Sequence, residues 1–357
     1  MTGQTKLLMA VATAGATLAV AACGSSSHSA SSPSAKSGSA ASSRATELTG
    51  AGSTLVAPLI SVWAPEYQRT AGVTIVYSAV GSGGGIASIT ARDVDFGASD
   101  APLTEDEFKE AKGVEQIPWA LTAVLVAYNV PGVGNELKLT GPVVAEIFLG
   151  KITNWDDPKI QALNPGVKLP SLKITPVYRT DGSGTTFAFT NYLSHISPEF
   201  KEKVGNSTQV RWPVGIGGKG NSGVGTQIAS TPGAIGYIGN AYVLENHYHF
   251  ALIQNAAGRY PVPDVETIEA AARAVTSAPE NNAISLVDPP ASAPDAYPIA
   301  TFTYVLVPLE SPKAETLKAF LKWAITTGQK FGPHLDFIPL PPSVVKIDEA
   351  AIEKIKP

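Results

Sequence analysis

From residue 47 onward, the chain alternates short β-branched segments with segments of helical periodicity, and this alternation is the strongest constraint on its fold. Residues 73–77 are typical of a strand, whereas the apolar residues of 55–68 recur at nearly helical spacing. Further strands are predicted at 121–128, 173–178 and 234–238. Further helices are predicted at 140–149 and 187–195, one more begins at 104, and another begins at 311 and ends at Gly328. The alternation favours an α/β fold with mostly parallel sheets.

The first 22 residues have the pattern of a secretory signal peptide. Residues 7–22 are uncharged and, as a helix, reach only about 24 Å, which is less than the ~30 Å hydrocarbon core of a membrane. We therefore predict a cleaved leader rather than a permanent span. The leader ends in small residues before Cys23, the one cysteine of the chain, and this junction resembles the lipobox of bacterial lipoproteins. Cys23 is expected to be lipidated and to become the mature N-terminus; the alternative is a plain signal peptide with a free thiol nearby.

Residues 23–46 are dominated by Ser, Ala and Gly and lack apolar periodicity, so they are predicted to form a flexible tether. Three of the 26 basic residues and none of the 30 acidic residues lie in residues 1–46, so the remainder carries 23 basic and 30 acidic side chains. This balance excludes a broad nucleic-acid binder that relies on a basic surface. A single cysteine excludes an intrachain disulfide framework and a multi-cysteine zinc site.

Four loops of similar chemistry lie where ligands bind in α/β sheets, beyond the carboxyl ends of strands. They are Gly-Ala-Gly-Ser-Thr at 50–54, Gly-Ser-Gly-Gly-Gly at 81–85, Asp-Phe-Gly-Ala-Ser-Asp at 95–100 after a strand ending at Val94, and Arg-Thr-Asp-Gly-Ser-Gly-Thr-Thr at 179–186. Three of them lead into predicted helix N-termini, where unpaired N–H groups and the helix dipole favour anions. A single loop of this kind is more simply a turn or a helix cap. Three together, one of them with Arg179, indicate an anion site.

Several other kinds of site are excluded by spacing. No Gly-rich loop ends in Gly-Lys-Ser/Thr, so there is no P-loop. The run from Gly50 does not fit a dinucleotide fingerprint, because no strand is evident before it. The Gly-x-Ser-x-Gly nucleophile elbow is missing around Ser82, Ser183 and Ser222. The five histidines are scattered, and the pair at 247 and 249 is typical of solvated structure rather than of a metal site. We therefore expect no metal, no cofactor and no catalytic residue.

Taken together, these segments resemble the PstS family, the phosphate-binding lipoproteins of bacterial phosphate ABC importers. The resemblance covers residues 47–357 and rests on six segments in the same order: 48–54, 80–85, 95–102, 147–155, 179–186 and 231–237. Two positions depart from the family pattern, which often has Phe where Leu55 stands and Ser where Gly83 stands. The first change costs little, because residue 55 contributes its backbone N–H; the second removes a minor hydroxyl contact.

The resemblance implies a periplasmic-binding-protein type II fold, with two α/β domains, a two-strand hinge and a ligand cleft between the domains. Domain I would comprise residues 47–122 and 300–357, and domain II residues 123–299. The long β-rich runs at 117–129 and 299–307 are the expected crossing strands.

The resemblance also implies which residues hold the phosphate. One domain would donate hydrogen bonds from Thr54, the Leu55 N–H and Ser82, and the other from Ser183, the Gly184 N–H and Thr185. Arg179 would supply the full positive charge through its planar fork, and Asp181 would orient that fork. Asp100 would accept the proton that phosphate carries and sulfate lacks, and so would exclude sulfate.

The implied protein is a monomeric, lipid-anchored, extracytoplasmic phosphate-binding component of an ABC importer, and not an enzyme. Its partners would be inorganic phosphate, the transmembrane permease with its cytoplasmic ATPase, and the membrane through the lipid on Cys23. Three alternatives stay open. The chain could be a secreted phosphatase-like hydrolase that uses Ser183 or Ser82, a binding protein for sulfate or molybdate, or a surface lipoprotein for adhesion or sensing.

Overall fold

The computed structural model describes residues 46–357 except 136, 276–278 and 280, and the described residues form one compact unit. The predicted signal peptide, the lipidated Cys23 and all but the last residue of the tether lie outside the described residues. The strands are β1 (Glu47–Gly52), β2 (Thr74–Ser78), β3 (Phe96–Ser99), β4 (Val114–Tyr128), β5 (Leu137–Leu139), β6 (Thr175–Arg179), β7 (Ile216–Gly218), β8 (Ala234–Gly239), β9 (His249–Ile253) and β10 (Ala300–Pro308).

The helices alternate with these strands as expected. They are α1 (Ala57–Ala71), α2 (Ser82–Thr90), α3 (Glu105–Ala111), α4 (Gly141–Phe148), α5 (Pro158–Leu163), α6 (Gly184–Ile196), α7 (Pro198–Lys203), α8 (Gly220–Ser230), α9 (Asn240–Asn246), α10 (Val265–Arg273), α11 (Ala314–Ile325), α12 (Pro342–Ile352) and the 3-10 turns η1 (Thr327–Phe331) and η2 (Pro333–Leu335). In the described part of the chain, no helix combines the length and the apolar character needed to cross a membrane.

The strands form a mixed sheet in the order β2-β1-β3-β10-β4-β8-β6-β7, and β9 and β5 continue from β4. The two flanks are parallel, because β1 pairs with β2 and β3, and β6 pairs with β7 and β8. The two long strands between the flanks run antiparallel: β10 pairs with β3 and β4, and β4 with β8. The expectation of mostly parallel pairing therefore holds for the flanks and not for the centre.

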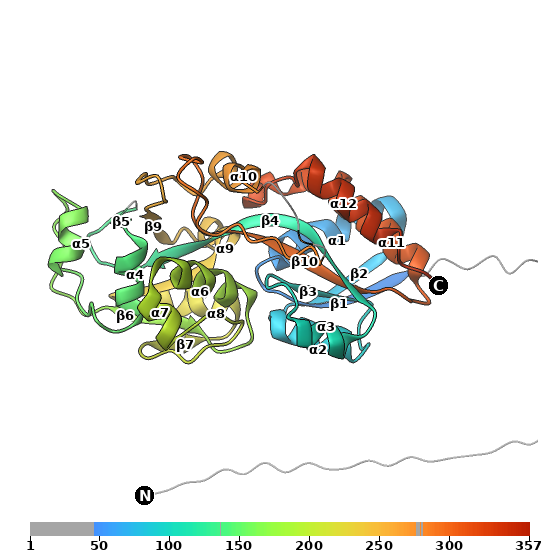
Figure 1. Cartoon of the computed structure of the whole chain (residues 1–357), viewed down its shortest axis with the longest axis horizontal. Coiled ribbons are helices and arrows are strands. Elements are labelled where there is room, and N and C mark those ends of the chain that lie inside the picture. Colours follow the sequence, from blue (N-terminus) through green and yellow to red (C-terminus); the bar gives the residue numbers. More distant parts are fainter. Residues whose placement is uncertain (1–45, 136, 276–278, 280) are drawn as a thin grey trace, which may run out of the picture. The chain divides into compact units, whose positions relative to one another are not determined.

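Strands β4 and β10 connect two groups of elements (Figure 1). We call the first group the terminal lobe; it contains β1–β3 with α1–α3, and the C-terminal helices α11 and α12. The second group, the middle lobe, contains β5–β9 with α4–α9. Strand β4 pairs with β10 over Val114–Ala123 and with β8 over Val124–Tyr128. The predicted crossing runs are therefore the long strands β4 and β10.

Each lobe has its own aromatic core. In the terminal lobe, Trp63 and Trp119 meet edge to face, with ring centroids 5.4 Å apart, and both are fully buried. In the middle lobe, Phe189 stacks on Tyr237 at 4.5 Å. Buried aromatic pairs of this kind contribute about 0.5–1.5 kcal/mol each beyond the area that they bury. The loops at the strand ends therefore extend from two separately packed aromatic clusters.

Three local expectations need correction. A strand, β1, does precede and include Gly50, and the ring of Phe96 lies where a Cβ on Gly50 would be. The dinucleotide fingerprint still fails, because Leu55 stands where its third glycine is required. Residues 96–99 are themselves a strand, instead of following one that ends at Val94. Finally, α11 ends at Ile325, and Gly328 lies inside the turn η1.

The C-terminal helix α12 buries an acid that has no partner. Asp348 is fully buried, and neither of its carboxyl oxygens has a hydrogen-bond partner among the described residues. Burial raises the pKa of Asp348 to about 9, so the carboxyl keeps its proton at pH 7. The unfolded chain releases that proton near pH 4, and the folded state therefore loses stability as the pH rises between these two values.

We expect Asp348→Asn to remove this pH dependence. Relative to the variant, the free energy of unfolding of the unmodified chain should fall from pH 4 toward pH 9, by at most roughly 1.4 kcal/mol per pH unit. Urea unfolding at several pH values measures the difference. Glu349→Gln, on the exposed side of the same helix, is the matched control and should run parallel to the unmodified chain. Parallel profiles for Asp348→Asn would show that the carboxyl is not held neutral.

Candidate anion-binding site

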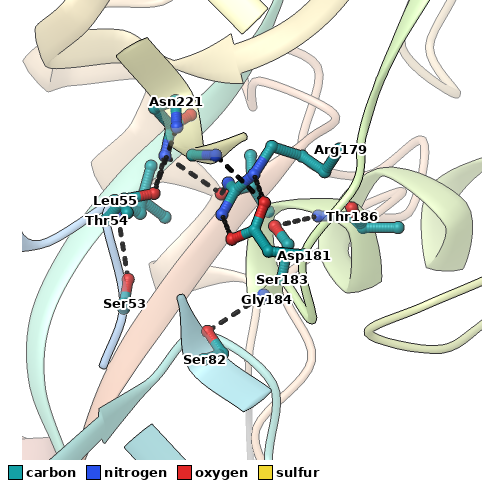
Figure 2. A network of polar contacts seen from close by, with 12 residues as sticks. Ser53, Thr54, Leu55, Ser82, Arg179, Asp181, Ser183, Gly184, Thr186 and Asn221 are labelled. Carbon is teal, nitrogen blue, oxygen red and sulfur yellow. Dashed lines mark hydrogen bonds and ion pairs between the residues drawn. The ribbon is translucent and has the colours of Figure 1, made fainter. Parts of the chain in front are cut away.

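Loops from both lobes meet at buried hydrogen bonds (Figure 2). In the terminal lobe, Thr54 follows β1 and Ser82 begins α2; in the middle lobe, Gly184 begins α6 and Asn221 lies in the first turn of α8. The Gly184 N–H donates to Ser82 Oγ at 2.9 Å, and Asn221 Nδ2 donates to Thr54 Oγ1 at 2.7 Å. All four residues are buried. Two of the predicted loops of the terminal lobe thus contact the middle lobe directly.

Arg179, the last residue of β6, places a buried cation at this junction. Its side chain is only 1% exposed. Nε and Nη2 donate to the two carboxylate oxygens of Asp181 at 2.8 and 2.5 Å, and Nη1 donates to Thr185 Oγ1 at 3.4 Å. Asp181 also accepts the Gly220 N–H at 3.0 Å. Burial alone would raise the pKa of Asp181, but the hydrogen bonds and charge of Arg179 outweigh it, so that pKa lies below its usual value.

Asp100, directly after β3, is the second acid of the junction, and it is buried. It accepts hydrogen bonds from Ser53 Oγ at 2.5 Å and from Ser82 Oγ at 3.4 Å. Burial raises the pKa of Asp100 to about 6, although the hydrogen bond from Ser53 and the charge of Arg179 act in the opposite direction. Above that pH the group is a carboxylate, and below it a carboxylic acid that can donate. The site therefore combines one permanent cation with one acid that titrates close to neutrality.

Backbone N–H groups at helix N-termini add further donors. Ser183 is the N-cap of α6, and its Oγ accepts from the Thr186 N–H at 3.1 Å. The helix starts at Gly184, three residues before the predicted start, which places the Gly184 N–H in the first turn. The Leu55 N–H donates to Ser53 Oγ at 3.0 Å. Both predicted backbone donors, at 55 and 184, therefore point to serine hydroxyls in this structure.

The structure brings all nine residues that the sequence predicts for the site into two neighbouring sets of hydrogen bonds. In the first set, Asn221 links Thr54 to Thr185, Arg179 and Asp181, and Ser183 joins through Thr186 and Tyr237. The second set contains Leu55, Ser82, Asp100 and Gly184, together with Ser53. The predicted lipidation site, Cys23, lies outside the described residues. Within residues 46–357, as far as they are described, no group of three or more His, Cys, Asp or Glu side chains is placed to hold a metal ion.

Tyr237, on β8, hydrogen-bonds to two residues of the Arg179 loop. This role was not predicted from the sequence. The Tyr237 hydroxyl accepts the Arg179 N–H at 3.0 Å and contacts Thr186 Oγ1 at 2.8 Å. Because Tyr237 also stacks on Phe189 in the core of the middle lobe, it ties the Arg179 loop to that core. Tyr237 is the last residue of segment 231–237, one of the six segments on which the family resemblance rests. The pattern of that segment predicts a strand and does not indicate a polar role for Tyr237.

Ser53 and Asn221 were also missed. Ser53 lies inside the first predicted loop, but only its neighbour Thr54 was predicted to bind phosphate. Asn221 lies in Gly-Gly-Lys-Gly-Asn-Ser-Gly at 217–223, which leads into α8. This segment has the same composition and the same position before a helix as the other loops. The criterion used for those loops, a run rich in glycine and small polar residues before a helix, also predicts an anion-binding loop at 217–223.

Comparison with known proteins agrees with this geometry. Residues 37–327 match the profile of a family described as PBP superfamily domain. The chain is 44% identical to the phosphate-binding protein PstS of Xylella fastidiosa (strain Temecula1) over 313 residues, which cover 86% of this chain and 85% of that protein. This likeness shows the family, and it confirms the prediction of a binding protein rather than an enzyme.

Solved structures confirm the fold. A phosphate-binding protein from Stenotrophomonas maltophilia superposes with a TM-score of 0.67 at 21% identity, over 86% of this chain and 94% of that one. A putative phosphate ABC transporter substrate-binding protein from Clostridium perfringens, with bound phosphate, gives a TM-score of 0.61 at 19% identity, over 83% and 100%. The predicted type II periplasmic-binding-protein fold is therefore confirmed. The chain belongs to the PstS family of the PBP superfamily.

Proposed function

We propose that this protein binds inorganic phosphate between its two lobes and delivers it to an ABC importer. The observation that carries the proposal is the junction of Arg179 and Asp100, both buried and close enough for the charge of Arg179 to lower the pKa of Asp100. A site with one fixed cation and one titratable acceptor suits an oxyanion that keeps a proton at neutral pH, as phosphate does. The match to phosphate-binding relatives supports the same ligand.

The ligand would replace contacts that the loops now make with one another. In the described part of the chain, Asp181 and Thr185 take up three of the five N–H groups of the Arg179 guanidinium, and two are left for phosphate oxygens. Thr54, Ser82, Ser183, Thr185 and the N–H groups of Leu55 and Gly184 would donate to the other oxygens. The Ser82–Gly184 hydrogen bond would open so that both partners face the ligand.

Binding of this kind implies closure of the lobes. We place the two domains at residues 47–122 with 300–357, and at residues 123–299, with β4 and β10 as the hinge. The separate aromatic cores and the connecting long strands support this division. The hydrogen bond from Asn221 to Thr54, which the ligand does not replace, would form only when the lobes are closed.

The finer statements about location and partners follow from the sequence and the family. Residues 1–22 would direct export, and Cys23 would carry the lipid that holds the protein at the outer face of the cell membrane. We assign it a monomeric state and, as partner, the transmembrane permease subunits with their cytoplasmic ATPase. The putative ABC transporter substrate-binding protein from Clostridium perfringens supports the transport context.

Equilibrium dialysis of residues 47–357 against radiolabelled phosphate tests the proposal. We expect one phosphate retained per chain and no release of chromophore from a chromogenic phosphate monoester in a parallel assay. Failure to retain phosphate would overturn the proposal. Turnover of the ester at ordinary enzyme rates would favour a hydrolase that uses Ser82 or Ser183.

Gly184→Ala should weaken phosphate binding, because the backbone of one lobe closely approaches the other lobe there. A Cβ at this position would lie 2.5 Å from Asp100 Cβ and 2.6 Å from the Asp100 backbone nitrogen, so the backbone must move. Overpacking of this kind typically costs ~1–3 kcal/mol, which corresponds to roughly a five- to hundredfold loss of affinity. Gly134→Ala, where a Cβ meets open space, is the matched control. Equal affinities for the two variants in a phosphate titration would contradict the close approach of Asp100 and α6.

A further inference from the structure

Asn221 is fully buried at the junction of the lobes, and no part of the proposed phosphate cradle has been assigned to it. Its Nδ2 donates to Thr54 Oγ1 at 2.7 Å and to Thr185 Oγ1 at 3.4 Å, and its backbone N–H donates to Thr54 Oγ1 at 3.3 Å. The side chain therefore contacts one proposed phosphate ligand from each lobe. Figure 2 shows Asn221 beside Thr54.

The orientation of the Asn221 amide is determined by the backbone. Its Oδ1 accepts the Gly239 N–H at 2.9 Å, at the end of β8. Because a backbone N–H can only donate, the oxygen must face Gly239, and the NH₂ group must face the two threonines. Asn221 is thus held as a donor toward the site.

This orientation determines where the two threonine protons point. A hydroxyl has one proton and two lone pairs. Thr54 Oγ1 accepts from both the N–H and the Nδ2 of Asn221, and Thr185 Oγ1 accepts from Asn221 Nδ2 and from Arg179 Nη1. With their lone pairs engaged, both hydroxyls can contribute only as donors to a further partner. An anion needs donors of this kind, whereas a free hydroxyl is equally able to accept.

We propose that Asn221 is a positioning residue that sets the hydroxyls of Thr54 and Thr185 as donors toward the bound anion. The inference rests on the proposed function, since it concerns the same site. In this proposal, Asn221 does not contact phosphate directly. Its effect on binding passes through the two hydroxyls, and this distinguishes it from a residue that merely holds the lobes together.

A double-mutant cycle on residues 47–357 tests this coupling, with phosphate as the titrant. Asn221→Ala should weaken phosphate binding roughly tenfold or more, because the two hydroxyls lose the donor that orients them. In a Thr54→Val background the same substitution should cost much less, since one of the hydroxyls on which it acts is gone. Thr54→Ser keeps the hydroxyl and is the matched background, in which the full loss should return.

Equal losses in the Thr54→Val and Thr54→Ser backgrounds would overturn the inference, and so would an Asn221→Ala variant with unchanged affinity. If Asn221→Ala does not fold, the isosteric Asn221→Asp replaces it. The introduced carboxylate would accept from both threonines and turn their protons away, so phosphate affinity should fall and should recover, relative to the unmodified chain, as the carboxyl is protonated toward pH 5. No recovery would count against the inference. If the unmodified chain binds no phosphate, the proposed function fails; if it binds and the cycle is additive, only the role of Asn221 fails.

Discussion

Arg179→Met is expected to lower phosphate affinity more than any other single substitution in the cradle. The guanidinium is 1% exposed and is the cation on which both Asp100 and Asp181 depend. Its removal would leave the buried Asp100 and the half-buried Asp181 without this positive charge, in addition to the lost contacts with phosphate. Breaking a buried pair in this way costs about 3–5 kcal/mol. A loss of that size in the bound state corresponds to a roughly 10²- to 10⁴-fold weaker affinity.

Two further variants make this result specific. Arg179→Lys keeps the charge but not the planar fork, so it should bind phosphate with intermediate affinity. Arg69→Met removes an exposed arginine whose partner is Glu66 on the same helix, and it should bind as the unmodified chain does. A calorimetric titration of all three measures the losses. Arg179→Met binding within about threefold of the unmodified chain would show that the cation is not a ligand.

Asp100→Asn is expected to convert a phosphate-selective site into one that also accepts sulfate. At neutral pH sulfate carries no proton, so the ionised Asp100 would face it as an unpaired like charge in a buried site. An asparagine amide can instead donate to a sulfate oxygen. We expect sulfate affinity to rise roughly 10²-fold and phosphate affinity to change much less. Competition between the two anions measures the ratio, and a ratio equal to that of the unmodified chain would show that Asp100 does not select.

The same acid predicts a pH dependence. Because burial raises the pKa of Asp100 to about 6, the group is mostly ionised at pH 8 and mostly protonated at pH 5. Sulfate binding by the unmodified chain should therefore tighten as the pH falls, roughly tenfold per unit above the pKa, and level off below it. Asp100→Asn should show no such slope. A sulfate affinity of the unmodified chain that does not change between pH 8 and pH 5 would show that Asp100 does not titrate in this range.

The sequence predicted those parts of the site that depend on local chemistry. Glycine, serine and threonine runs before helices mark positions where backbone N–H groups are free, and the runs at 50–54, 81–85 and 179–186 all lie at the junction. The capping pattern from Thr104 to Glu107 likewise predicts α3, and the structure confirms it with both hydrogen bonds of a capping box. These features need only neighbouring residues, so a linear pattern is sufficient.

Features that depend on distant residues could not be predicted in the same way. Strand β1 contains Gly50 and Gly52, which are poor strand formers, and it exists because β2 and β3 pair with it on both sides. The partner of Asn221 is Thr54, 167 positions earlier in the chain. Asp348 reads as an ordinary polar residue of a surface helix, and only the packed structure shows it buried without a partner. Tertiary packing determined each of these.

Parallel isothermal titrations of residues 47–357 with phosphate, arsenate and sulfate at neutral pH test the central claim most directly. Phosphate and arsenate both keep a proton under these conditions, and sulfate does not. We predict saturable binding of one phosphate or one arsenate per chain, and little or no heat with sulfate. Sulfate that binds as tightly as phosphate, or a chain that gives no heat with phosphate, would contradict the account.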